Sequence, residues 1–153
     1  MKSINALITS ALLSVTISIT ITSPLLADEN PASNRQIPPI IAIIIDDMGH
    51  NLTEGERLIA LDQPLTLAFL PFRRHTTRLA EKAHLHQKEI MLHAPMANTR
   101  LLELGPGGLN PDMSQPEMAV TLRRALRSIP HVRGVNNHMG SLLTQQLRAM
   151  DWV

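Results

Sequence analysis

Residues 40–47 read IIAIIIDD, a run of apolar and mostly β-branched residues that ends on two consecutive carboxylates. β-branched side chains favour strands, and an unbroken apolar run is typical of a parallel strand that is covered on both faces. We therefore predict a strand over 40–45, central in its sheet, with helices on one side. Asp46 and Asp47 then stand at the carboxyl end of that strand.

Downstream of this strand, short apolar runs alternate with segments of helical period, which indicates βα units and a parallel sheet. The predicted fold class is therefore α/β. Further strands are expected at 65–70, 89–93 and, more weakly, 132–136; helices are expected at about 54–61 and 77–86, from Ser114 to Ile129, and from Leu143 to the last residue.

Local signals set the expected boundaries of these elements. Thr53 with Glu56, and Ser114 with Glu117, have the spacing of capping boxes at helix starts. Pro95 is expected to stop the third strand, because proline cannot donate to a strand ladder. The glycine-rich segment 95–113 is predicted to be a long loop over one rim of the sheet.

The first 27 residues have the pattern of a signal peptide. They contain Lys2 but no acidic residue, a long apolar stretch, a breaker at Pro24 and then Leu-Leu-Ala. We expect cleavage after Ala27, export to the periplasm and no stable membrane span afterwards, with a retained anchor as the alternative. Residues 28–39 are polar and proline-rich and are predicted to be a linker to a domain over 40–153.

Composition limits the classes of partner. The chain has 14 basic and 13 acidic residues, and removal of residues 1–27 takes away one lysine and no acid. A neutral chain of this kind gives no electrostatic reason to bind nucleic acid. Because the chain contains no cysteine, an exported form must be held together by core packing without disulfides.

Polar residues follow three of the predicted strands: Asp46 and Asp47, then His93, then the run Asn136-Asn137-His138. Because the carboxyl ends of parallel strands share one rim, these groups are expected to converge. Consecutive strand residues point to opposite faces, so the two carboxylates can share a pocket only if the chain turns at once. The pair Met48-Gly49 is expected to make that turn.

One carboxylate and two imidazoles on one rim make a three-ligand metal site with a position left open for water, as in catalytic zinc centres. The second carboxylate is then free to take a proton from that water. The residues alone equally allow a structural interpretation, in which the Asp pair caps the turn and each histidine is a hydrogen-bonded turn residue.

Four strings, in this order and spacing, resemble the divergent polysaccharide deacetylase family, relatives of the NodB-type carbohydrate esterases: IAIIIDDMGHN, LTLAFLPF, EIMLHAPM and GVNNHMGSLLT. The resemblance covers nearly all of 40–153. It implies the N-terminal half of an irregular NodB-like (β/α) barrel, incomplete at its C-terminus. A helix still running at Val153 is the further sign that leads us to expect truncation.

The resemblance also implies roles for single residues. Asp46 matches the catalytic base of the family, and Asp47, His93 and His138 match its ligands for a divalent metal, for which zinc is our first choice. NodB-type enzymes carry a second histidine four residues after the first. Position 97 is alanine here, so His138 is expected to take that place.

The implied function is metal-dependent hydrolysis of N-acetyl groups on a polysaccharide or a peptidoglycan-like glycan. In NodB-type enzymes, later strands bring an arginine that orients the base and a histidine that acts as general acid, and this chain stops before them. Two alternatives therefore stay open: a non-catalytic glycan-binding or cell-envelope protein that keeps the fold, and an inactive fragment.

Overall fold

The computed structural model describes residues 38–153, of which Pro39–Val153 form one compact unit. The signal peptide expected over 1–27 lies outside the described residues, as does the linker expected over 28–39 apart from Pro38 and Pro39. No helix within 38–153 is long and apolar enough to cross a membrane.

Four parallel strands form one sheet in the order β1-β2-β3-β4. Their bounds are Ile44–Met48 for β1, Thr66–Phe69 for β2, Glu89–Met96 for β3 and Gly134–Met139 for β4. The helices between them are α1 (Leu52–Ile59), α2 (Thr76–Leu85) and α3 (Gln115–Arg127). The predicted α/β class is confirmed, and the arrangement is consistent with half of a NodB-like barrel.

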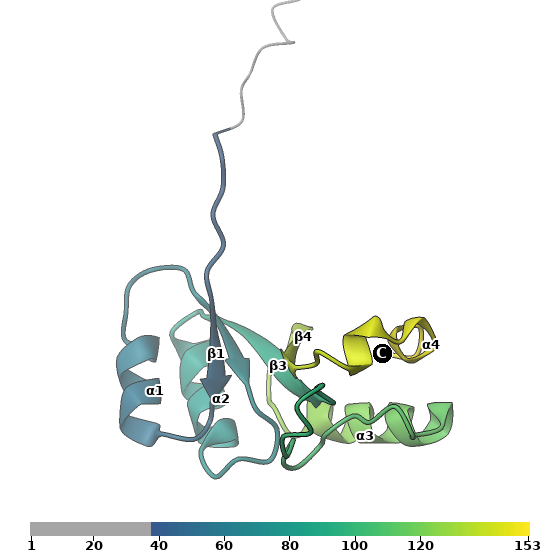
Figure 1. The fold of residues 1–153 in the computed structure, drawn as a ribbon. Coiled ribbons are helices and arrows are strands. Elements are labelled where there is room, and N and C mark those ends of the chain that lie inside the picture. Colours follow the sequence, from purple (N-terminus) through teal and green to yellow (C-terminus); the bar gives the residue numbers. More distant parts are fainter. Residues whose placement is uncertain (1–37) are drawn as a thin grey trace, which may run out of the picture. The chain divides into compact units, whose positions relative to one another are not determined.

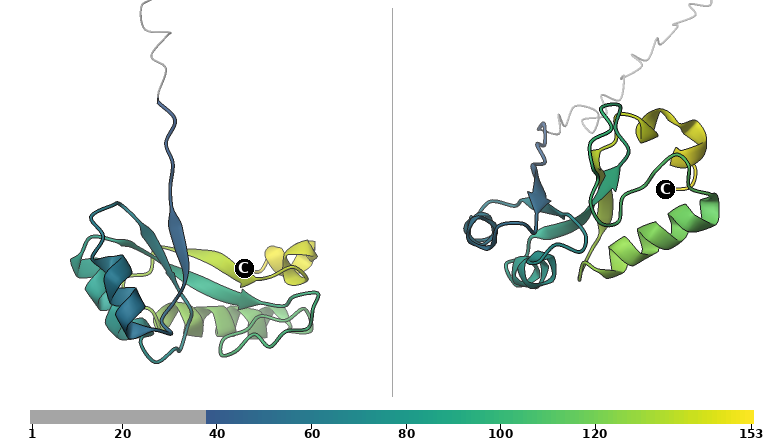
Figure 2. Two further views of the ribbon diagram at one scale, coloured as in Figure 1. Left: turned by 60° about the vertical axis from the view of Figure 1, so that its left-hand side comes forward. Right: turned by 60° about the horizontal axis from the view of Figure 1, so that its bottom comes forward.

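The helices of the three crossovers lie on one face of the sheet (Figures 1 and 2). Right-handed crossovers produce this arrangement when the strand order follows the chain. On that face, Ile90, Leu92, Ala94 and Met96 of β3 join the hydrophobic core with residues of α2 and α3. Because strand residues alternate between faces, His93 lies on the opposite face, away from the helices.

The position of the first strand corrects the prediction. β1 begins at Ile44, not residue 40, and it lies at an edge of the sheet, not at the centre. Ile40 and Ile41 are 86% and 85% exposed. β1 pairs only with β2, whose four residues offer partners from Ile44 to Met48, so the earlier isoleucines extend past the paired region. The strand propensity of residues 40–45 predicted a strand, but pairing with β2 determines which of these residues form it.

β3 and β4 are longer than predicted. β3 continues through Pro95 to Met96, and β4 continues to Met139, so His138 lies inside its strand and not after it. Pro95 fits because β2 ends opposite Leu92, and the missing N–H therefore costs no bond to β2. On that side the backbone N–H of Leu109, from the long loop, donates to the Pro95 carbonyl at 2.8 Å.

The helix starts agree only partly with the predicted capping boxes. The side chain of Asn51, not Thr53, caps α1 by accepting from the N–H of Glu54 at 3.1 Å. In α3 the Glu117 carboxylate accepts from the N–H of Ser114 at 2.8 Å, the bond expected of a capping box, and also from the Ser114 hydroxyl at 2.6 Å.

The continuous helix expected from Leu143 to the last residue is wrong. A 3₁₀ turn, η1 (Leu143–Gln145), is followed by a separate short helix, α4 (Leu147–Met150). Gln146 lies between them with extended backbone angles, which interrupts the helical path. Leu143 is fully buried and Ala149 is 5% exposed, so packing of these two side chains against the core fixes both pieces.

Candidate metal centre

A bulge in β1 brings both carboxylates to the same side. Ile45 pairs with Leu67 and Met48 pairs with Phe69, so β1 has one more residue than β2 over this stretch. Asp47 has a φ of +59°, in the left-handed region. The extra residue breaks the alternation of the strand and re-aims the side chains around it. The turn that the sequence assigned to Met48-Gly49 therefore begins inside the strand.

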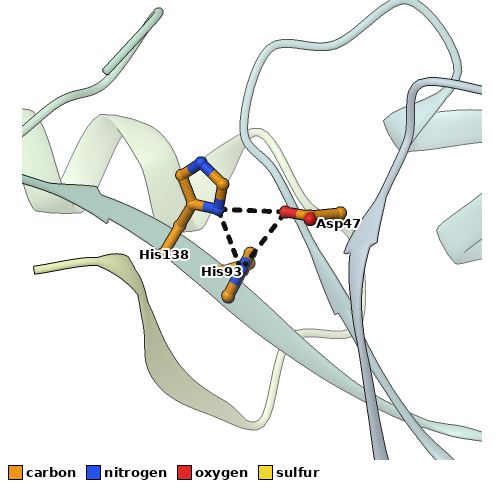
Figure 3. Close-up of side chains that lie close together, drawn as sticks. All are labelled: Asp47, His93 and His138. Atoms are coloured by element: carbon orange, nitrogen blue, oxygen red, sulfur yellow. Dashed lines mark hydrogen bonds and ion pairs between the residues drawn. The ribbon is translucent and has the colours of Figure 1, made fainter. Parts of the chain in front are cut away.

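Asp47, His93 and His138 point toward one another from β1, β3 and β4 (Figure 3). Asp47 Oδ1 lies 2.9 Å from His138 Nδ1 and 3.4 Å from His93 Nε2, and these two nitrogens are 3.1 Å apart. We call these three atoms the ligand triangle. Four ligands at about 2.0–2.1 Å from a tetrahedral zinc ion are about 3.3–3.4 Å from one another. The triangle is within a few tenths of an ångström of that spacing, so its residues fit such an ion.

Asn136 orients the first histidine. It lies directly opposite His93 in the β3–β4 register, and its Oδ1 is 2.9 Å from His93 Nδ1. An amide oxygen can only accept, so His93 Nδ1 carries the proton, and in the neutral ring Nε2 keeps a free lone pair toward the triangle. The Asn136 amide nitrogen donates to Asp46 Oδ1 at 2.8 Å. One side chain thus connects Asp46 to His93.

The centre is buried on one side and open on the other. His93 is 3% exposed, whereas the side chains of Asp46 and Asp47 are 49% and 62% exposed. Burial lowers the pKa of His138 below its ordinary value, and the charges of His93 and Arg73 lower it further, against the opposing effect of Asp47. Neutral imidazole is the form that binds metal, so this environment favours metal binding.

Asp46 stands beside the triangle and not in it. Its Oδ1 is 3.7 Å from His93 Nδ1, the ring nitrogen that faces away from the three ligand atoms. Its other oxygen, Oδ2, makes no hydrogen bond with any side chain or backbone group of residues 38–153. Ala97 is 6% exposed and belongs to the hydrophobic core, so position 97 is no part of the site.

The structure therefore brings together all four residues singled out from the sequence, and their chemical roles stay predictions. No role for Asn136 was predicted from the sequence. Residues 136 and 138 share one face of a strand, so the period of two would have indicated Asn136 had the strand been drawn as far as His138. Arg73 was not predicted either, because its place near His138 depends on a loop with no sequence signal.

A comparison with protein-family models matches residues 43–153 to the family described as divergent polysaccharide deacetylase. The chain belongs to this family. The match begins one residue before β1 and contains the whole ligand triangle.

Two curated relatives and one solved structure are similar to the chain. It is 35% identical to YibQ of Escherichia coli K12 and 27% identical to a protein of Haemophilus influenzae, each over 113 residues and 74% of the chain. The crystal structure of ATU2773 from Agrobacterium tumefaciens superposes with a TM-score of 0.67 and 23% identity over 72% of the chain, which supports the fold. All three are described as uncharacterised. The chain spans 35%, 40% and 46% of their respective lengths.

Proposed function

We propose that this chain is an exported, metal-dependent deacetylase domain that hydrolyses N-acetyl groups on a glycan. The observation that carries the proposal is the ligand triangle of Asp47, His93 and His138, with the separate carboxylate of Asp46 beside it. Membership of the divergent polysaccharide deacetylase family supports the choice of substrate class.

Asp47, His93 and His138 would hold the metal, and zinc is the best fit to one carboxylate and two imidazoles at tetrahedral spacing. A bound zinc ion supplies Lewis acidity and lowers the pKa of its water toward neutrality. Asn136 keeps His93 in the tautomer that turns a lone pair to the triangle.

Asp46 acts as the base in this proposal. Water adds to the amide carbonyl as Asp46 Oδ2 takes its proton, Asp46 then returns this proton to the amide nitrogen, and the C–N bond breaks to give acetic acid and a free amine. The hydrogen bond from the Asn136 amide to Oδ1 fixes the orientation of the carboxylate and leaves Oδ2 free to take the proton. The half-exposed position of Asp46 allows a polysaccharide to reach it.

A second candidate is a glycan-binding protein that keeps the metal pocket without turnover. One observation favours it. The departing amine needs a proton, yet within residues 38–153 the ion pairs of the ligand triangle involve four side chains, those of Asp46, Asp47, His93 and His138. An acid other than these four would have to come from elsewhere.

The deciding experiment measures acetate release from N-acetylglucosamine oligomers by the full chain, purified with zinc. Asp46→Asn should lower the rate at least about a hundredfold, as expected for loss of a general base, with zinc content unchanged. Asp62→Asn, an exposed carboxylate away from the site, is the matched control. Oligomer binding with no acetate release from the unsubstituted chain would favour the second candidate. Absence of both would reject the two together.

A further inference from the structure

Two neighbouring surface cavities share the side chain of Phe72. The smaller, of about 230 Å³, lies between Phe72, Gly107 and Arg124. The larger, of about 510 Å³, lies between Phe72, Arg73 and Arg127. We call this surface the basic groove and define it by Phe72, Arg73, Arg124 and Arg127.

The charge of the basic groove is unbalanced. Among the described residues that line the two cavities none is acidic, and none of the three arginines makes an ion pair with a residue of 38–153. Arg73 Nε is buried and has no hydrogen-bond partner there. The terminal Nη atoms of Arg73 donate to no residue of 38–153 either, so they are left for a ligand, and a guanidinium binds a planar carboxylate through paired hydrogen bonds.

Phe72 gives the groove an apolar platform. Its side chain is 44% exposed although it is aromatic, and its φ of +58° is costly for a bulky residue. A Cβ atom at Gly107 would lie 3.1 Å from the ring carbon Cε2, so the glycine lets the loop pass close to the ring. An exposed ring held in this way offers a flat surface for the C–H groups of a sugar.

The loop that carries Phe72 and Arg73 is hydrogen-bonded to the segment that follows Asp47. The N–H of Leu70 donates to the Met48 carbonyl at 3.0 Å, and the N–H of His75 donates to the Gly49 carbonyl at 3.1 Å. These bonds flank Phe72 and Arg73 and tie their loop to the two residues that directly follow Asp47. One extended molecule could therefore occupy both the groove and the centre.

We propose that the basic groove binds a carboxylate-bearing sugar next to the acetylated one, so that the substrate class is an acidic glycan. The inference rests on the proposed function and makes its substrate more specific. Charge complementarity selects an anion, and the exposed ring selects a sugar over an isolated carboxylate. The near-neutral charge of the whole chain argues against a general polyanion site.

The test compares the Kd of the full chain, measured by calorimetry, for two matched oligosaccharides. One alternates N-acetylglucosamine with glucuronate, and the other has each carboxylate reduced to an alcohol. The acidic form should bind roughly tenfold tighter, as expected for hydrogen bonds to a charged group. Equal affinity for the two oligosaccharides would overturn the inference.

Substitutions then locate the preference. Arg124→Gln combined with Arg127→Gln should remove most of the preference for the acidic oligosaccharide. Both arginines are exposed, so the fold should persist in this variant. Arg123→Gln is the matched control, because Arg123 is exposed on the same helix and lines neither cavity. Phe72→Ala should weaken the binding of both oligosaccharides to a similar degree. An equal loss in the Arg123 variant would refute the assignment of the groove.

A single-stranded oligonucleotide of equal charge distinguishes a sugar site from a general anion site, and binding as tight as that of the acidic oligosaccharide would overturn the inference. Failure here is separable from failure of the proposed function. Acetate release without any preference for the acidic form would reject the groove and keep the deacetylase. A charge preference without acetate release would keep the groove and reject the deacetylase.

Discussion

Asn136 lies directly opposite His93 in the register of β3 and β4, with its side-chain oxygen 2.9 Å from His93 Nδ1. Its amide nitrogen reaches the Asp46 carboxylate on β1, two strands beyond β3 in the sheet. The residue proposed as base and the first imidazole of the ligand triangle are therefore oriented by the same side chain. Metal affinity and proton transfer should both depend on it.

Replacement of this side chain should weaken metal binding. We expect Asn136→Ala to lower zinc affinity by about 10- to 100-fold, the usual cost of losing a group that orients a metal-bound histidine. The physical reason is that His93 loses the acceptor that fixes its tautomer and ring angle. Titration with a competing chelator measures the change.

The neighbouring Asn137 provides the control. It points to the other face of β4, and its amide donates to the backbone carbonyl of Met139 at 2.7 Å. Asn137→Ala should leave zinc affinity within about threefold of the unsubstituted chain, well short of the loss expected for an orienting group. If both variants lose the same affinity, the orienting role of Asn136 is wrong.

Zinc should stabilise the folded chain through the ligand triangle. A ligand that binds only the folded state at a hundred times its Kd adds about 2.7 kcal/mol, which raises Tm by several degrees. A chelator should reverse the shift, and His138→Ala should abolish it. His50→Ala is the control, because His50 is exposed and outside the triangle. A shift that survives in the His138 variant would place the ion elsewhere.

The sequence predicts which segments form the sheet better than it predicts where each strand begins and ends. Apolar runs and helical periods were sufficient to predict four parallel strands joined by helices, because each of these patterns is local in the sequence. The bounds of β1 were not predictable, because the short β2 decides which isoleucines find partners. Pro95 misled the prediction for a similar reason, since its tolerance depends on where β2 ends.

The convergence of Asp46, Asp47, His93 and His138 follows from parallel topology and was predictable. The bulge that turns both carboxylates to one side was not, because it requires a left-handed residue at Asp47, which has no special local signal there. The groove at Phe72 and Arg73 was not predictable either, because the residues that surround these side chains come from a long loop and from α3, both distant in sequence.

The α3 cap gives a pH-dependent prediction. Hydrogen bonds from the Ser114 side chain, and then from its backbone, lower the pKa of Glu117 below its ordinary value of 4.5. A group whose pKa is lowered by folding stabilises the folded state above its unfolded pKa, and this effect is lost as pH falls. Glu117→Gln should therefore lower Tm at pH 7, with the difference shrinking as pH drops below about 4.5. A difference that stays constant from pH 7 to pH 3 would contradict this origin.

Gly55 tests whether packing or helix propensity dominates in α1. An alanine there should favour the helix by up to about 1 kcal/mol. Its Cβ, however, would lie 2.6 Å from Cδ1 of Leu79, which is fully buried on α2. Overpacking of this kind costs about 1–3 kcal/mol, so we expect a net loss of stability for Gly55→Ala in urea unfolding. In the Leu79→Ala background the space is free, and the same substitution should become neutral or stabilising. A loss of equal size in both backgrounds would mean that the close approach of α1 and α2 is not the reason for the glycine.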